Sequence, residues 1–150
     1  MNKKRINDWI LPAQEAIKDN GMVENGVINK TYRGQISAFG AAVVMGSLKS
    51  AIAFFSDSDK ASVDRTKLIK AMYQLITRKA NAEPVEIFQY VCDHDGYATE
   101  EKFTDASVAI KLALNFYKLV DDPPKYKNDD TKKDAENNAN EDAKEGQGDE

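Results

Sequence analysis

Apolar residues recur every three or four positions along most of the first 120 residues, and no stretch keeps up the alternation of apolar and polar residues that marks a strand. This period is typical of helices that place one face in a core. Glycines, prolines and helix-capping residues separate the periodic segments. Together they predict six helices, at about 4–19, 29–45, 48–55, 62–81, 84–92 and 99–120, joined by short loops into a compact all-α bundle.

Two features of the first thirty residues modify this picture. Pro12 lies inside the first periodic segment, where it should kink the helix or make it restart. The pairs Asn20-Gly21 and Asn25-Gly26 then indicate a loop, with a short hairpin as the alternative.

Capping residues set the other predicted helix boundaries. Ser47 is expected to cap the third helix, and Ser62 or Asp64 the fourth. Pro84 suits the first position of the fifth helix. Thr99, followed by two glutamates, is a strong start signal for the sixth.

The last 29 residues differ in composition from everything before them. They contain one aromatic residue and no Ile, Leu, Val, Phe or Met. Such a segment buries too little apolar surface to offset its ordering entropy, so we expect a helical domain at 1–121 and a disordered acidic tail at 122–150. The tail is interpreted as a solubilising segment, with competition against nucleic acid as the alternative.

The net charge of −4 is divided unevenly between these two parts. Residues 121–150 carry eleven acidic residues against five lysines, a net of −6, which leaves 16 basic and 14 acidic residues before them. The predicted folded part is therefore mildly basic, and local surfaces rather than the overall charge decide which partners bind.

Hydropathy and cysteine content predict a cytoplasmic location. No apolar run approaches the roughly 18 residues that a membrane-spanning helix needs, so no membrane partner is expected. Lys3, Lys4 and Arg5 are not followed by the apolar region of a signal peptide. A single cysteine, Cys92, suits a reducing compartment.

The residues that usually carry catalysis are sparse. His94 is the only histidine, and Cys92, two positions before it, should point in another direction. Asp93 and Asp95 resemble the start of a calcium loop, but the positions for its glycine and final glutamate hold other residues. No phosphate loop or dinucleotide fingerprint is present either. We therefore expect a protein that is not an enzyme and uses no cofactor or metal ion.

The predicted fourth helix has one apolar and one basic face. Lys67, Lys70, Gln74 and Arg78 fall on one side of a helical wheel, and Leu68, Ile69, Met72, Leu75 and Ile76 fall on the other. Between Lys60 and Lys79 there are six basic residues and one acidic residue, Asp64. Carboxylates nearby in the sequence are therefore not expected to neutralise the basic side.

This basic side has two interpretations. Charge runs on helices are usually solvated surface. Alternatively, Lys67, Lys70 and Arg78 follow the phosphate backbone of RNA without reading its bases, a mode of binding that weakens as salt rises. Lys49, Arg33 and Lys30 would extend the patch if their helices lie beside the fourth.

The segment 32–55, which reads YRGQISAFGAAVVMGSLKSAIAFF, resembles the signature region of the small helical subunit of type III-B CRISPR (Cmr) effector complexes. In that region, a helix of small residues that starts with an aromatic residue ends at a Gly-x-Leu or Gly-Leu turn, and an Ala-x-Ala-Phe helix follows. Gly46, Ser47 and Leu48 depart from the tighter Gly-Leu form of this turn. The chain also agrees with the family in length and number of helices.

The resemblance implies a non-catalytic subunit of an antiviral ribonucleoprotein. Such a subunit stacks along the repeated backbone subunit of the complex, can stack on copies of itself, and borders the groove where guide RNA pairs with target RNA. Cleavage of RNA in these complexes belongs to other subunits. The basic side of the fourth helix fits this role.

Three other readings remain open at this point. The chain could be a helical protein–protein interaction module whose basic side meets an acidic partner. It could be the small subunit of a type III-A complex, which is also a small helical bundle. The third is a helical enzyme that depends on His94.

Overall fold

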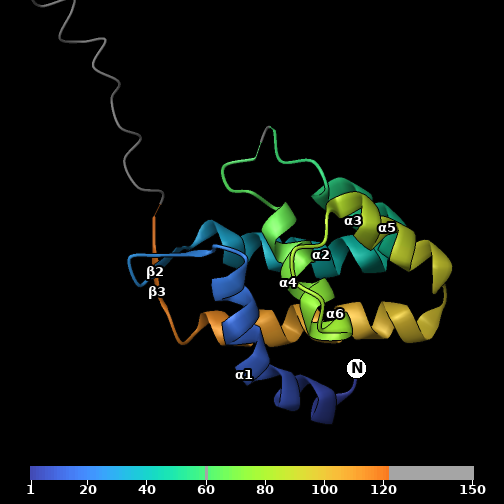
Figure 1. Ribbon diagram of the computed structural model, residues 1–150, viewed down its shortest axis with the longest axis horizontal. Helices are drawn as coiled ribbons and strands as arrows, with labels where there is room; N and C mark the ends of the chain where they lie inside the picture. The colour runs from blue at the N-terminus through green and yellow to red at the C-terminus, as the bar shows by residue number, and fades with distance from the viewer. Residues whose placement is uncertain (60, 122–150) are drawn as a thin grey trace, which may run out of the picture.

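The computed structural model describes residues 1–59 and 61–121. Six helices dominate this part of the chain, which confirms the predicted all-α bundle (Figure 1). The helices are α1 (Lys3–Asp19), α2 (Thr31–Met45), α3 (Leu48–Phe55), α4 (Thr66–Thr77), α5 (Pro84–Asp93) and α6 (Tyr97–Leu114). The strands are β1 (Val23–Glu24), β2 (Val27–Asn29) and β3 (Lys118–Val120). The predicted acidic tail, 122–150, lies outside the described residues.

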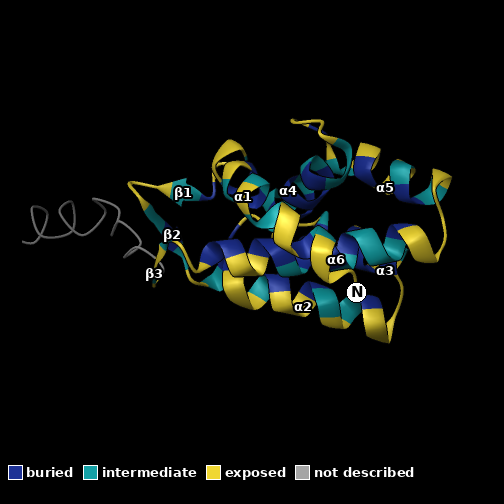
Figure 2. Cartoon of the chain, turned by 90° about the horizontal axis from the view of Figure 1, so that it is seen from below, coloured by how far each residue is buried: buried dark blue, intermediate teal, exposed yellow. Residues whose placement is uncertain are grey.

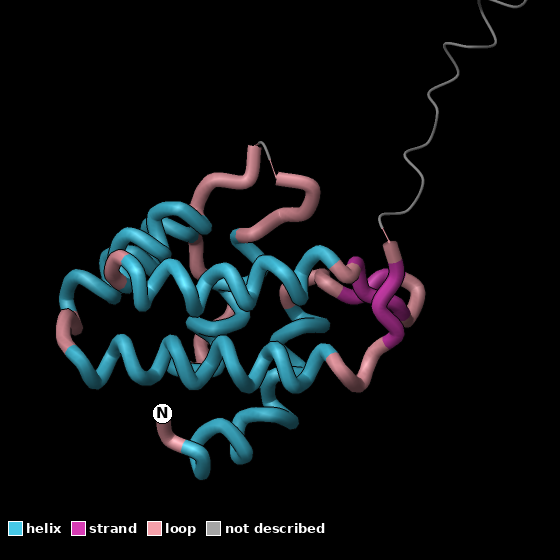
Figure 3. Tube along the Cα trace, turned by 180° about the vertical axis from the view of Figure 1, so that it is seen from behind, coloured by secondary structure: helices cyan, strands magenta, loops and turns pink. Residues whose placement is uncertain are grey.

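Helices α2 and α6 run side by side through the length of the bundle (Figures 2 and 3). They are antiparallel, because β2 leads into α2, β3 follows α6, and these two strands pair with each other. α1 and α4 pack across α6, and α5 packs against α3. Among the described residues, no helix has both the length and the hydrophobicity needed to cross a membrane.

The core lies where these helices meet. Most of the periodic apolar positions are buried as predicted, but Phe54, Leu112 and Phe116 are exposed. Phe39, Phe55 and Phe103 are among the largest side chains with no appreciable exposure. The rings of Phe39 and Phe55 meet edge to face with their centroids 5.3 Å apart, an arrangement that aromatic pairs prefer. This contact holds α2 and α3 together across the turn between them.

Several local predictions are confirmed. The side chain of Ser47 accepts a hydrogen bond from the backbone N–H of Ser50 at 3.1 Å, and the hydroxyl of Ser50 accepts one from the backbone N–H of Ser47. Pro84 occupies the start of α5. α1 is assigned as one helix through Pro12, and Figure 3 shows its two halves running in different directions.

A small three-stranded sheet replaces part of what the sequence predicts as loop and helix. The hairpin alternative is correct, because β1 and β2 pair antiparallel across a turn in which Asn25 and Gly26 both have positive φ. This is the turn geometry that Asn-Gly favours. β3 then pairs in parallel with β2, and the N–H of Lys30 donates to the carbonyl of Val120 at 2.8 Å.

The predicted end of the sixth helix at about residue 120 is therefore wrong. α6 ends at Leu114, and the N–H groups of Phe116 and Tyr117 bond to carbonyls three residues back rather than four. The chain then enters β3. The start of α6 is also earlier than predicted, at Tyr97 after Gly96. The hydroxyl of Thr99 donates to the carbonyl of His94 instead of capping the helix.

The predicted fourth helix, 62–81, is too long at both ends. α4 begins at Thr66, whose N–H donates to the carboxylate of Asp64 at 3.0 Å. It ends at Thr77, because Arg78 adopts a left-handed conformation with φ of 62°. Asn81 is also left-handed, with φ of 61°, so the chain turns twice before α5.

Candidate nucleic-acid interface

The apolar side of α4 lies in the core, and its polar side faces the end of α1. Leu68, Ile69, Met72 and Leu75 are buried as predicted, while Lys67, Lys70 and Gln74 are half-buried instead of fully solvated. The amphipathic pattern is thus confirmed, but the predicted open basic surface is partly covered.

Hydrogen bonds fix this polar side against the turn after α1. The ammonium of Lys67 donates to the carbonyl of Gly21 at 3.0 Å. The amide nitrogen of Gln74 donates to the carboxylate of Asp19 at 2.8 Å, and its oxygen accepts from Asn20 at 3.1 Å. Lys67 and Gln74, two side chains of the predicted basic side, therefore help to hold α1 and α4 together.

A hollow of about 310 Å³ lies between these elements. Lys67 and Lys70 line it together with three carboxylates. Its full lining is Asp19, Asn20, Gly21, Asp64, Lys67, Lys70, Asn81 and Glu83. The sequence prediction considered only carboxylates nearby along the chain, and Asp19 and Glu83 reach the hollow from other parts of the fold.

Asp64 contributes a negative charge to this hollow at neutral pH. Burial acts to raise its pKa, but hydrogen bonds from Thr66 and Ser58 and the nearby Lys67 ammonium outweigh it, so the pKa is lowered. At neutral pH a phosphate group approaching Lys67 would meet a carboxylate as well as an ammonium.

The same carboxylate also acts on a buried tyrosine. Burial, together with the Asp64 and Glu24 carboxylates, raises the pKa of Tyr32 to about 12.

Arg78 lies beyond the end of α4 and so is not on the basic side of that helix. Because it follows the last residue of α4 in a left-handed conformation, its side chain leaves the helix at a different angle from Lys67 and Lys70. The residue itself is exposed, so its guanidinium is open to a partner.

Lys30 and Arg33 lie at one end of α2 and Lys49 lies beyond the other. The 15 residues of α2 separate these groups by about 22 Å along the helix axis. Lys30 forms an ion pair with Asp121, Arg33 is exposed, and Lys49 pairs with Asp95 at 2.8 Å. Lys49 is therefore far from Lys30 and Arg33, and Lys67 and Lys70 are the two of the six predicted RNA-binding residues that line the hollow beside α4.

His94 and Cys92 occupy the end of α5. The ring of His94 stacks on Tyr90 with centroids 4.2 Å apart, and its Nδ1 lies 2.9 Å from the Tyr90 carbonyl oxygen. Cys92 is a half-buried free thiol. In the part of the chain that the structure describes, no three His, Cys, Asp or Glu side chains gather in a way that could hold a metal ion.

Sequence reasoning missed the acidic half of this site. Asp19 ends α1 and Glu83 immediately precedes α5, and neither position signals a contact with α4. Only their convergence in the fold reveals the mixed charge. No protein-family model, curated protein or solved structure matches this chain.

Proposed function

We propose that this chain is a non-catalytic small subunit of a type III-B CRISPR (Cmr) effector complex. In this role it stacks along the repeated backbone subunit and contacts the groove of guide and target RNA. The observation that carries the proposal is the corner between α2 and α3, because the segment 32–55 that resembles the family forms this corner.

The glycine in this corner has a steric role. A Cβ added to Gly46 would lie 2.8 Å from the Ser50 hydroxyl and 3.2 Å from the Ala42 carbonyl, too close for any larger residue without movement. Ser47 then caps α3. The glycine and serine that follow the helix of small residues are therefore what this sharp turn requires.

The outward side of α2 supports a role in assembly. Its exposed positions are small or apolar: Gly34, Ser37, Ala38, Ala41, Val44 and Met45. A helix face of this composition permits close approach of another helix, and exposed apolar side chains on a small domain commonly mark contacts with other proteins. Arg33 is the single charge among these outward positions.

RNA contact in this proposal rests on phosphate-directed cations. Lys67, Lys70 and Arg78 are the principal candidates, with Lys49, Arg33 and Lys30 as secondary ones. Because Asp19, Asp64 and Glu83 share the hollow with two of the lysines, we expect the isolated chain to bind RNA weakly. Strong retention would require the neighbouring subunits.

The test is purification of the tagged chain from its host, followed by sequencing of bound RNA and identification of co-eluting proteins. We expect RNA of guide length with repeat-derived ends, together with larger effector subunits. A chain that elutes alone and without RNA would contradict the proposal.

A charge-reversal pair then tests the basic residues. Lys70→Glu with Arg78→Glu should reduce retained RNA in the assembled complex and leave the helical circular dichroism unchanged. Lys3→Glu with Lys111→Glu is the matched control, because both lysines are exposed and the change in net charge is the same. Equal retention by the two double variants would contradict a role for Lys70 and Arg78.

The mixed charge of the hollow favours one alternative, a protein–protein interaction module, which includes the small subunit of a type III-A complex. Interleaved ammonium and carboxylate groups suit a protein surface of similar mixture better than a polyphosphate. Displacement of a bound partner by RNA but not by heparin would argue against simple charge pairing with an acidic protein.

A further inference from the structure

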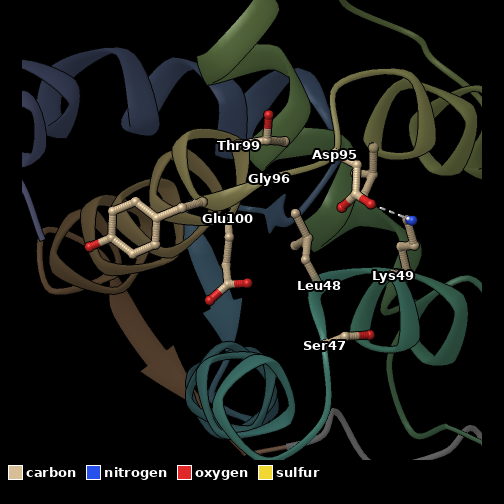
Figure 4. Close-up of a pocket in the computed structure, with 9 residues that line it drawn as sticks. Ser47, Leu48, Lys49, Asp95, Gly96, Thr99 and Glu100 are labelled. Carbon is tan, nitrogen blue, oxygen red and sulfur yellow. Dashed lines mark hydrogen bonds and ion pairs between the residues drawn. The ribbon is translucent and has the colours of Figure 1, made fainter.

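A second hollow, of about 380 Å³, lies at the end of the bundle opposite the small sheet (Figure 4). The turn between α2 and α3 forms one wall, and the turn between α5 and α6 forms the other. Its lining is Ser47, Leu48, Lys49, Val91, Asp95, Gly96, Tyr97, Thr99 and Glu100. The site is thus built by two chain segments about fifty residues apart in sequence.

One carboxylate in this hollow has no counter-ion. Lys49 and Asp95 neutralise each other, since their ion pair of 2.8 Å raises the pKa of Lys49 and lowers that of Asp95. Within the described residues, no side chain or backbone donor pairs with the Glu100 carboxylate. Figure 4 shows Glu100 on the other side of Leu48 from the ion pair, directed toward the open space.

The charge of the hollow selects against nucleic acid. One ammonium and two carboxylates give it a formal net charge of −1. Glu100 lies in the first turn of α6, at the end of the helix where the dipole interacts favourably with a negative charge. A phosphate here would be repelled, whereas an ammonium or guanidinium group would gain a partner.

Apolar side chains also line this hollow. Leu48 and Val91 are buried at its base, and Tyr97 on its rim is 75% exposed. The last turn of α2, which leads directly into Ser47, carries Val44 and Met45 at 84% and 87% exposure. Exposed apolar side chains of this size, two or three residues before Ser47 along the chain, suit a surface that another molecule covers.

We propose that this hollow is a protein-docking site that accepts a lysine or arginine side chain of a partner protein, with Glu100 as the counter-ion. The apolar stem of that side chain lies against Leu48 and Tyr97, and apolar neighbours in the partner segment cover Val44 and Met45. The proposal does not depend on membership of a CRISPR complex, but it excludes RNA contact by Lys49, which is one of the secondary candidates above.

A library of displayed 12-residue peptides, selected against the immobilised full-length chain, tests the proposal. We expect the enriched peptides to share a Lys or Arg flanked by apolar residues. A labelled peptide from this set is then titrated by fluorescence anisotropy. Because a hydrogen bond to a charged group is lost, Glu100→Gln should weaken its binding about tenfold or more.

Two further variants make the result specific. Tyr97→Ala should weaken the same peptide by removing apolar contact area, and Glu15→Gln, an exposed carboxylate of α1, should leave binding unchanged. A thermal melt checks that each variant is folded. Enriched peptides without a basic residue, equal binding by Glu100→Gln, or failure to enrich any peptide would overturn the proposal. Self-association that Glu100→Gln abolishes would also overturn it, by assigning the hollow to a second copy of the chain.

Discussion

The ion pair between Arg5 and Asp105 offers the sharpest test of how α1 is held to the bundle. Asp105 is fully buried in α6, and the Arg5 guanidinium donates to it at 2.8 Å with 26% of the arginine side chain exposed. The N–H of Asn2 donates to the same carboxylate at 3.2 Å. Replacing Arg5 by methionine keeps much of the side-chain volume and removes the positive charge.

The expected loss follows from the charge left behind. Removing one partner of a buried ion pair costs about 3–5 kcal/mol, because the remaining charge is no longer compensated. Arg5 is partly exposed and Asn2 still donates, so we expect a value near the lower end, about 3 kcal/mol. That is a large fraction of the 5–15 kcal/mol that typically stabilises a domain.

Urea denaturation followed by circular dichroism measures this loss. With a slope of about 1.5 kcal/mol per molar urea, the midpoint for Arg5→Met should fall by about 2 M. Lys4→Met is the matched control, because Lys4 pairs with Asp8 on the exposed surface of the same helix. Its midpoint should equal that of the wild type within error.

A double variant separates loss of the pair from loss of packing. Arg5→Met combined with Asp105→Leu removes the buried charge together with its partner, so it should recover at least half of the lost stability. The reasoning is refuted if the double variant is no more stable than Arg5→Met, or if Arg5→Met is as mild as Lys4→Met.

Four further variants test two glycines of the α2 segment, the cap of α3 and the buried Tyr32. Gly46→Ala should destabilise the fold by about 1–3 kcal/mol, because the added Cβ conflicts sterically with the turn between α2 and α3. Gly34→Ala has open space around its Cβ position, so it should stabilise the fold by about 0.5–1 kcal/mol in the same urea assay. Ser47→Ala should cost about 1 kcal/mol because the cap of α3 is lost, and an unchanged midpoint would contradict this. Because the folded state raises the pKa of Tyr32 to about 12, it holds that proton more tightly than the unfolded chain does, so stability should fall as pH rises from about 10 toward 12. Melting temperatures of Tyr32→Phe should lack this part of the alkaline decline, and parallel curves for the two proteins would refute the assignment.

The sequence by itself determined the six helices and several of their ends. These features are local, since the apolar period selects which face is buried and a cap or proline acts within one turn. Ser47 and Pro84 could therefore be assigned before the fold was known. The pattern of α4 also predicted its buried residues, because a helix with one apolar face has one way to enter a core.

Tertiary structure decided the sheet, the true end of α6 and the surroundings of each charge. β3 exists because Lys118–Val120 meets β2, 91 residues earlier, and helical period carries no information about such a partner. The same holds for charge. Lys67 and Lys70 lie on a basic side without nearby carboxylates when α4 is considered alone, but packing brings Asp19 and Glu83 to the same hollow. In the same way, the hollow beside Glu100 exists only because two turns distant in the sequence meet. Electrostatic contacts depend on distances in space, and a chain's own sequence records only distances along it.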